Sequence, residues 1–193
     1  MNRSARLTLT FTLISAVIVI AAHRAAAGTV EYRLTIDEKT VNLTGSPRSA
    51  VAVNGSIPAP TLTFREGDVA RIHVTNAMKV ESSIHWHGLL LPNRMDGVPF
   101  VTYPPIKPGA TFTYEFRIRQ RGTYWYHSHT ALQEQKGLYG AFVILPRRGG
   151  VSGDSDKAVV LSDWTDEDAH EVLRWLKRGS EWPALQRGNA QTM

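Results

Sequence analysis

Four of the seven histidines fall into two pairs with the same spacing, His85-x-His87 and His127-x-His129. In a β-strand, residues two apart point to the same face and lie about 6–7 Å apart along the chain. Two such strands side by side would therefore present four imidazoles on one surface. Neutral imidazole is a common ligand of copper and zinc, so the pattern indicates a metal site. The spacing leaves two interpretations open: both rings of a pair bind one ion, or each ring binds a different ion.

The other three histidines do not form pairs of this kind. His73 alternates with Arg71 and Thr75 on the polar face of a predicted strand, which is typical of a surface residue. His23 lies in the N-terminal segment, and His170 lies in a predicted helix. The candidate metal ligands are therefore the four paired histidines alone.

The 193-residue chain contains no cysteine. This absence excludes disulfides, thiolate zinc sites, iron–sulfur clusters and a cysteine nucleophile. It also excludes a blue electron-transfer copper site, which needs a thiolate ligand. A metal site on the paired histidines is therefore of another type.

The elements that must position these pairs follow a period-two pattern from residue 28 to about residue 146. Alternating apolar side chains, separated by glycine, proline and asparagine turns, predict strands at 30–36, 51–54, 61–64, 69–76, 112–118, 123–129 and 141–145. The first histidine pair is predicted to lie in a strand as well. Seven or eight short strands with no helical period between them indicate an all-β fold, an antiparallel sandwich or barrel.

The first 27 residues have the features of a secretory signal peptide. Arg3 and Arg6 precede an uncharged run of 16 residues, 7–22, and small residues at Ala25 and Ala27 fit cleavage after Ala27. The run is shorter than the about 20 residues that cross a bilayer, and no twin-arginine pair is present. We therefore expect export to the periplasm by the general secretory route. An uncleaved signal segment would be the only attachment to a membrane.

Much of the net positive charge lies in that segment. It holds three arginines and no acidic residue, so the net charge of +5 falls to +2 once it is removed. A mature chain so close to neutral has no electrostatic basis for binding nucleic acid.

The composition changes after residue 147. Residues 148–157 form a polar, glycine-rich linker, a further strand is predicted at 158–161, and Thr165-x-x-Asp168 predicts a helix at about 166–177. The residues that follow carry too little apolar material to complete a core. We therefore expect one complete domain at 28–147 and the incomplete, helix-containing start of a second at 158–193.

The motifs around the histidines resemble the first domain of the multicopper oxidases. The resemblance rests on residues 83–89 (SIHWHGL), 95–99 (MDGVP) and 122–129 (GTYWYHSH), and extends upstream to 53–61 and 66–68. Downstream, Gln133-Glu134-Gln135 and the segment LSDWTDED at 161–168 resemble one branch, the bacterial copper-resistance oxidases of the copper-resistance protein A type.

The resemblance implies a cupredoxin-like, Greek-key sandwich or barrel for 28–147, and copper in type 2 and type 3 sites. In that family a trinuclear copper cluster reduces dioxygen to water, and eight histidines from the first and last domains hold it. By motif, His85 would bind the type 2 copper. His87 and His127 would share one type 3 copper, and His129 would bind the other.

The resemblance also suggests a role for one carboxylate. Asp96 matches an acidic residue that helps deliver protons to the cluster, and a carboxylate suits a reaction that consumes protons. Asp-Gly is also a common turn pair, so a purely structural role stays open. Trp86 and Trp125 are expected to be core and scaffold residues rather than redox relays.

The chain departs from the family pattern in one large respect. It holds four of the eight cluster histidines, and Ser128 lies between His127 and His129 where the C-terminal motif would carry cysteine. We therefore expect a fragmentary chain: the N-terminal domain of a periplasmic multicopper oxidase of copper resistance, inactive alone. Further domains or a separately encoded chain would complete it, with O2 and cuprous ion or phenols as substrates. The alternatives are a stand-alone periplasmic copper-sequestering protein without redox turnover and, more distantly, a zinc enzyme.

Overall fold

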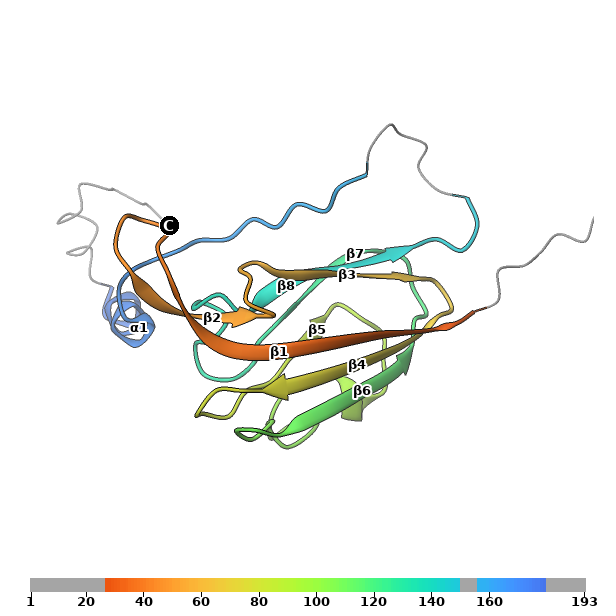
Figure 1. Ribbon diagram of the computed structural model, residues 1–193, viewed down its shortest axis with the longest axis horizontal. Coiled ribbons are helices and arrows are strands. Elements are labelled where there is room, and N and C mark those ends of the chain that lie inside the picture. The colour runs from red at the N-terminus through yellow and green to blue at the C-terminus, as the bar shows by residue number, and fades with distance from the viewer. Residues whose placement is uncertain (1–26, 150–155, 180–193) are drawn as a thin grey trace, which may run out of the picture.

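Two four-stranded sheets build the structure, a computed structural model that describes residues 27–149 and 156–179 (Figure 1). One sheet has the strand order β2-β1-β4-β6 and the other the order β3-β8-β7-β5. The elements are β1 (Thr29–Val41), β2 (Arg48–Val53), β3 (Ala59–Arg65), β4 (Val69–Asn76), β5 (His85–His87), the 3-10 turn η1 (Asn93–Met95), β6 (Thr111–Arg117), β7 (Gly122–His127), β8 (Tyr139–Leu145) and α1 (Ala169–Lys177). The all-β sandwich expected from the sequence is confirmed.

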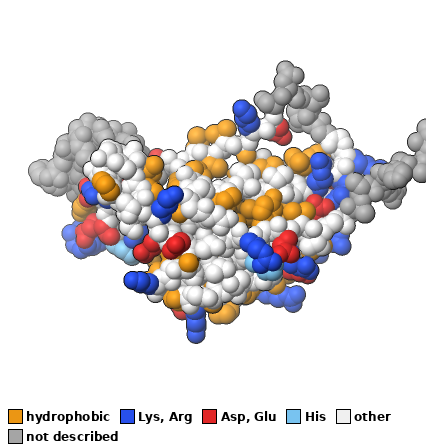
Figure 2. Space-filling view, viewed as in Figure 1, with side chains coloured by type: hydrophobic (Ala, Val, Ile, Leu, Met, Phe, Trp, Pro, Cys, Tyr) orange, Lys and Arg blue, Asp and Glu red, His pale blue; other side chains and the backbone are white. Residues whose placement is uncertain are grey.

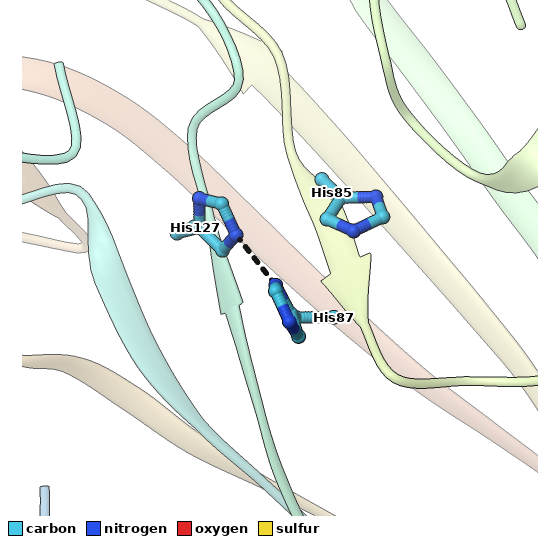
Figure 3. A group of neighbouring side chains, drawn as sticks. All are labelled: His85, His87 and His127. Atoms are coloured by element: carbon cyan, nitrogen blue, oxygen red, sulfur yellow. Dashed lines mark hydrogen bonds between the residues drawn. The ribbon is translucent and has the colours of Figure 1, made fainter. Parts of the chain in front are cut away.

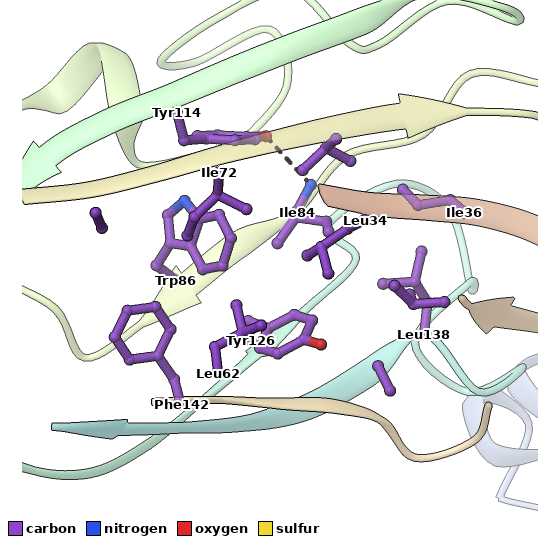
Figure 4. Packing of buried hydrophobic residues seen from close by; sticks show 14 of the residues in the cluster. Leu34, Ile36, Leu62, Ile72, Ile84, Trp86, Tyr114, Tyr126, Leu138 and Phe142 are labelled. Carbon is purple, nitrogen blue, oxygen red and sulfur yellow. Dashed lines mark hydrogen bonds between the residues drawn. The ribbon is translucent and has the colours of Figure 1, made fainter. Parts of the chain in front are cut away.

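The alternation along the strands decides which side chains fill the space between the sheets. In β4 every second side chain is buried, and in β6 Tyr114 and Phe116 point inward. Trp86 of β5 is fully buried, and its ring lies 5.1 Å from that of Tyr114 and 5.7 Å from that of Phe142 (Figure 4). Burying an aromatic side chain of this size contributes a few kcal/mol, so the strand that carries the first histidine pair is tied to the core through Trp86.

The pairing of the strands differs in part from the antiparallel arrangement expected. Of the six strand pairings among the described residues, β1–β4 and β3–β8 are parallel, and the other four are antiparallel. The chain leaves the first sheet after β2, passes through β3 in the second sheet and returns at β4, so β4 runs in the same direction as β1. Alternating hydrophobicity reports which face of a strand is buried and carries no information on strand direction, which is why the sequence did not reveal these pairs.

The segment that follows the sandwich is extended but is not a strand. Residues 158–161, predicted as a strand, have no strand partner in the part of the chain that the structure describes. Val159 and Leu161 are 76% and 91% exposed, and apolar side chains line the upper edge of the molecule in Figure 2. Apolar alternation alone does not form a strand, because the backbone groups also need a neighbouring strand to pair with.

The predicted helix is present but begins later than expected. It spans Ala169–Lys177, and Asp168 caps it by accepting hydrogen bonds from the backbone N–H groups of His170 and Glu171. The hydroxyl of Thr165, the first residue of the predicted capping motif, accepts a hydrogen bond from the N–H of Glu167, before the helix begins. Within the described ranges, no helix has the length and apolar character needed to cross a membrane. Most of the predicted signal peptide, part of the linker and residues 180–193 lie outside those ranges.

Candidate metal centre

The pairing of β5 with β7 brings the two histidine segments together. His85 lies directly opposite His127, Trp86 opposite Tyr126, and His87 opposite Trp125. Because β5 is the edge strand of its sheet, its histidines lie beside one neighbouring strand only. The register therefore places three imidazoles, His85, His87 and His127, on one side of the sheet (Figure 3).

The nitrogens of these three rings are close enough to share a metal ion. One ligand atom from each of His85, His87 and His127 lies within 4.8 Å of the others. The Nδ1 atom of His87 and the Nε2 atom of His127 are 3.2 Å apart, joined by the dashed line in Figure 3. Two imidazole nitrogens held at about 2.0–2.1 Å from one tetrahedral ion would be separated by about 3.3 Å. The observed spacing fits two ligands of a single ion.

His85 is held in one orientation by the loop that follows β5. Its Nδ1 lies 2.7 Å from the backbone carbonyl of Asp96, which can only accept, so Nδ1 carries the proton and Nε2 keeps a free lone pair. The residue after Asp96 explains why this loop lies so close to His85. Gly97 has φ +84°, and a Cβ there would lie 1.8 Å from the carbonyl oxygen of Ile84. Only glycine lets this loop pack against the start of β5.

Asp96 lies beside the cluster through more than its backbone. One carboxylate oxygen is 3.6 Å from Nδ1 of His85, and the side chain is 29% exposed. The carboxylate is thus in contact with both the solvent and the edge of the imidazole cluster. This position is compatible with the proton-delivery role and with the turn role that the sequence left open.

His127 is the most buried of the three rings, with a side chain 7% exposed. Its Nδ1 faces two acceptors, the carbonyl of Ser128 at 2.9 Å and the carboxylate of Glu134 at 2.7 Å. Nδ1 therefore carries the ring proton, and Nε2 presents its lone pair to His87. Burial lowers the pKa of His127, as do the neighbouring rings of His85 and His87, while the hydrogen bond to Ser128 and the charge of Glu134 oppose the shift. The neutral imidazole favoured by this environment is the form that binds metals.

His129 lies next to the cluster but not in the strand predicted for it. β7 ends at His127, and the N–H of His129 donates to the hydroxyl of Ser83 at 3.0 Å instead of to a neighbouring strand. The exposed ring of His129 is 5.5 Å from that of His85 and 6.0 Å from that of His127. The ring of His129 is thus as close to that of His85 as the rings of His87 and His127 are, while ligand atoms within 4.8 Å of one another come from the other three histidines. The predicted strand at 123–129 is two residues too long.

The two tryptophans beside the histidines occupy scaffold positions. Trp86 lies in the core, and Trp125 stacks on His127 with ring centroids 4.1 Å apart and an interplanar angle of 17°. Trp125 also stacks on His87 at 4.9 Å. Stacking on both rings restricts their rotation, which keeps the facing nitrogens in place.

Three polar residues that support the site were not recognised as such in the sequence. Glu134 contacts His127, Ser83 holds His129, and Gln133 is buried beneath the same turn. In the sequence, Ser83, Gln133 and Glu134 belong to motifs of the family resemblance, which assign them no role. No residue spacing points to them, because their partners are 5 to 52 positions away in the chain.

Comparisons with known proteins agree with this architecture. Residues 35–149 match the family described as multicopper oxidase. Copper resistance protein A of Escherichia coli is 47% identical over 153 residues, which are 79% of this chain and 25% of that protein. Laccase-2 of Botryotinia fuckeliana is 42% identical over 164 residues, covering 82% of this chain and 28% of that protein. The chain therefore spans about a quarter of the length of these relatives.

Solved structures show the same fold. The laccase from Botrytis aclada aligns with a TM-score of 0.69 at 41% identity, over 79% of this chain and 29% of that one. The multicopper oxidase from Pseudomonas thermotolerans aligns with a TM-score of 0.62 at 35% identity, over 64% of this chain and 31% of that one. The sandwich and its imidazole cluster thus define a cupredoxin-like, copper-binding type of domain. The chain belongs to the multicopper oxidase family and is related to the copper resistance proteins A.

Proposed function

We propose that this chain supplies the N-terminal half of the imidazole ligands for the oxygen-reducing copper cluster of a periplasmic copper-resistance oxidase. The observation that carries the proposal is the 3.2 Å separation of His87 Nδ1 and His127 Nε2, with His85 directly opposite His127. In this assignment His87 and His127 share one type 3 copper, His85 binds the type 2 copper and His129 the second type 3 copper. The signal-like segment at 1–27 supports a periplasmic location.

The residues of this chain have separate tasks in that assignment. When bound, copper supplies the one-electron steps that reduce dioxygen with electrons from cuprous ion or a phenol. His85 and His127 each keep Nε2 free as a ligand by donating Nδ1–H to an acceptor of the protein. Trp125 keeps the rings of His87 and His127 from rotating. Asp96 would pass protons from solvent to the cluster edge, which its 3.6 Å distance from Nδ1 of His85 and its partly exposed carboxylate support.

The chain alone is proposed to bind copper without catalytic turnover. It has no cysteine for an electron-entry copper, and four histidines are half of the set that the resemblance implies. His87 and His129 are exposed, as expected for ligands whose ion also needs donors from another domain or chain. Further domains or a separately encoded chain would supply those donors.

Copper titration of the purified chain tests the proposal. The chain should bind cupric ion, and replacement of His85, His87, His127 and His129 by asparagine should weaken binding by at least about 100-fold. The matched control is His73→Asn, because His73 lies on the other sheet and hydrogen-bonds Thr113. This control should bind copper as the unchanged chain does. Equal binding by the four-histidine variant and the control would reject the site.

Oxidase assays separate the lead function from copper sequestration. The chain alone should not oxidise cuprous ion or a diphenol, and turnover should appear when the remaining domains of a copper-resistance relative are added. Turnover by the chain alone would overturn the incomplete-cluster proposal. Stoichiometric copper binding that never leads to turnover with added domains would favour the sequestering protein.

A further inference from the structure

Glu134 contacts the buried histidine of the cluster from the side opposite the metal-binding nitrogen. Its carboxylate Oε2 lies 2.7 Å from Nδ1 of His127, while Nε2 of the same ring faces His87. The two nitrogens of an imidazole point in different directions, so an acceptor at one nitrogen fixes where the other points. Glu134 is therefore placed to act on the metal site without touching the metal.

The turn that carries Glu134 is anchored by its neighbour. The amide oxygen of Gln133 accepts hydrogen bonds from the hydroxyls of Ser82 at 2.7 Å and Ser128 at 2.9 Å. Its amide nitrogen donates to the carbonyl of Glu81 at 2.8 Å. Gln133 is 7% exposed, so these bonds are made away from solvent. A buried side chain with three hydrogen bonds holds the next residue of the turn against His127.

We propose that Glu134 is a positioning residue for His127. Its carboxylate lies 2.7 Å from Nδ1, and its negative charge favours the proton on that nitrogen, which donates its hydrogen bond to the carbonyl of Ser128. Glu134 thereby holds the tautomer and orientation that present the Nε2 lone pair to the cluster. Metal-ligating histidines commonly use their second nitrogen in this way, and the carboxylate makes the ring a stronger electron donor. The positioning is a property of the chain before any ion binds, and its consequence for copper affinity rests on the proposed function.

The carbonyl of Ser128 accepts the hydrogen bond of Nδ1, beside the charge of Glu134. It belongs to the residue next to His127 and lies 2.9 Å from Nδ1. A backbone carbonyl is neutral, whereas the carboxylate of Glu134 carries a charge that attracts the Nδ1 proton more strongly. Loss of Glu134 therefore leaves a weaker acceptor in place and a ring that is less strongly held.

Two measurements on the full chain test the role of Glu134. The first is the nitrogen-15 NMR signature of His127 in the metal-free chain, which reports which ring nitrogen is protonated. The second is the affinity for cupric ion alone. The variants are E134A, which removes the carboxylate, and E134Q, which keeps an amide oxygen without charge. The control is E115Q, since Glu115 pairs with Arg71 on the other sheet. Glu134 is 34% exposed, so the variants are expected to fold.

We expect E134A to lower the population of the Nδ1–H tautomer and to weaken copper binding by about 10–100-fold. E134Q should restore the tautomer but only part of the affinity, and E115Q should match the unchanged chain in both measurements. An unchanged His127 signature in E134A would overturn the proposal. If the unchanged chain bound no copper, the proposed function would fail while the NMR comparison still decided the role of Glu134.

Discussion

The two histidine segments have the same spacing but are held by different forces. His85 and His87 lie within β5, on either side of Trp86, whose side chain is fully buried. His127 is the last residue of β7, and His129 follows it in a segment without strand pairing. The first segment is anchored by hydrophobic packing between the sheets, and the second by hydrogen bonds among buried polar side chains.

The polar anchor of the second segment is a connected network. The hydroxyl of Ser128 donates to Gln133 and accepts from the N–H of Thr130, while Ser83 accepts from the N–H of His129 and from the hydroxyl of Thr130. Such a network specifies a geometry only when each member has its partner. The positions of His85 and His87 should therefore depend on packing in the core. Those of His127 and His129 should depend on these hydrogen bonds.

The largest expected effect comes from removing the hydrophobic anchor. W86A deletes a side chain that contacts the rings of Tyr114 and Phe142, and should lower the free energy of unfolding by about 3–5 kcal/mol. Urea unfolding followed by far-UV circular dichroism measures this loss. The matched control is W164A, because Trp164 is only partly buried and lies outside the sandwich. Equal losses in the two variants would contradict the role of Trp86 as the anchor of β5.

A smaller and more local effect is expected from breaking the polar anchor. Q133A removes the hydrogen-bond partner of the buried hydroxyls of Ser82 and Ser128 and of the part-buried carbonyl of Glu81, and should lower the unfolding free energy by about 2–3 kcal/mol. The NMR signals of His127 and His129 should shift, while those of His85 should not.

The control for the polar anchor is Q135A, since Gln135 is exposed on the same turn. It should leave both stability and the histidine signals unchanged. A shift of the His85 signals as large as those of the second segment in Q133A would mean that the two segments are not held independently.

The same contrast explains what the sequence could and could not predict. Strand patterns at 69–76 and 112–118 gave the observed strands closely, because alternating burial is a local property of the chain. The spacing also predicted that two neighbouring strands would carry the histidines on one surface, whereas the register that places His85 opposite His127 comes from the structure. The end of β7 before His129 was missed, because the hydroxyl of Ser83 that replaces the ladder comes from a residue 46 positions away.

The sequence also did not predict the contacts that support the site or the direction of the strands, because both depend on how segments of the chain meet in the folded sandwich. Glu134 contacts His127 across the turn that follows β7, and Gln133 also bonds Ser82 and Glu81 of a distant segment. No spacing rule connects either residue to His127. The predicted strand at 158–161 failed in the opposite way: its local pattern was present, but the described chain offers no partner strand. Local patterns predict faces and elements, whereas contacts between distant segments decide which backbone groups are paired.

The smallest expected effect is a pH dependence confined to the second segment. Burial, with His85 and His87 nearby, lowers the pKa of His127 in the folded chain, against the opposing hydrogen bond to Ser128 and charge of Glu134. In the unfolded chain His127 titrates near 6.5. Below that pH the unfolded chain therefore binds a proton that the folded chain does not yet bind. Stability should be complete above about pH 6.5 and fall as the pH drops towards the folded value.

Urea unfolding of the metal-free chain between pH 8 and pH 5, with a chelator present, measures this dependence. H127Q removes the titrating ring, so the difference in unfolding free energy between the unchanged chain and H127Q isolates its contribution from that of the other acids and bases. This difference should decrease on acidification, by about 1.4 kcal/mol for each unit that separates the folded from the unfolded pKa. A constant difference would mean that burial does not act on His127, and that the second segment is held by its hydrogen bonds alone.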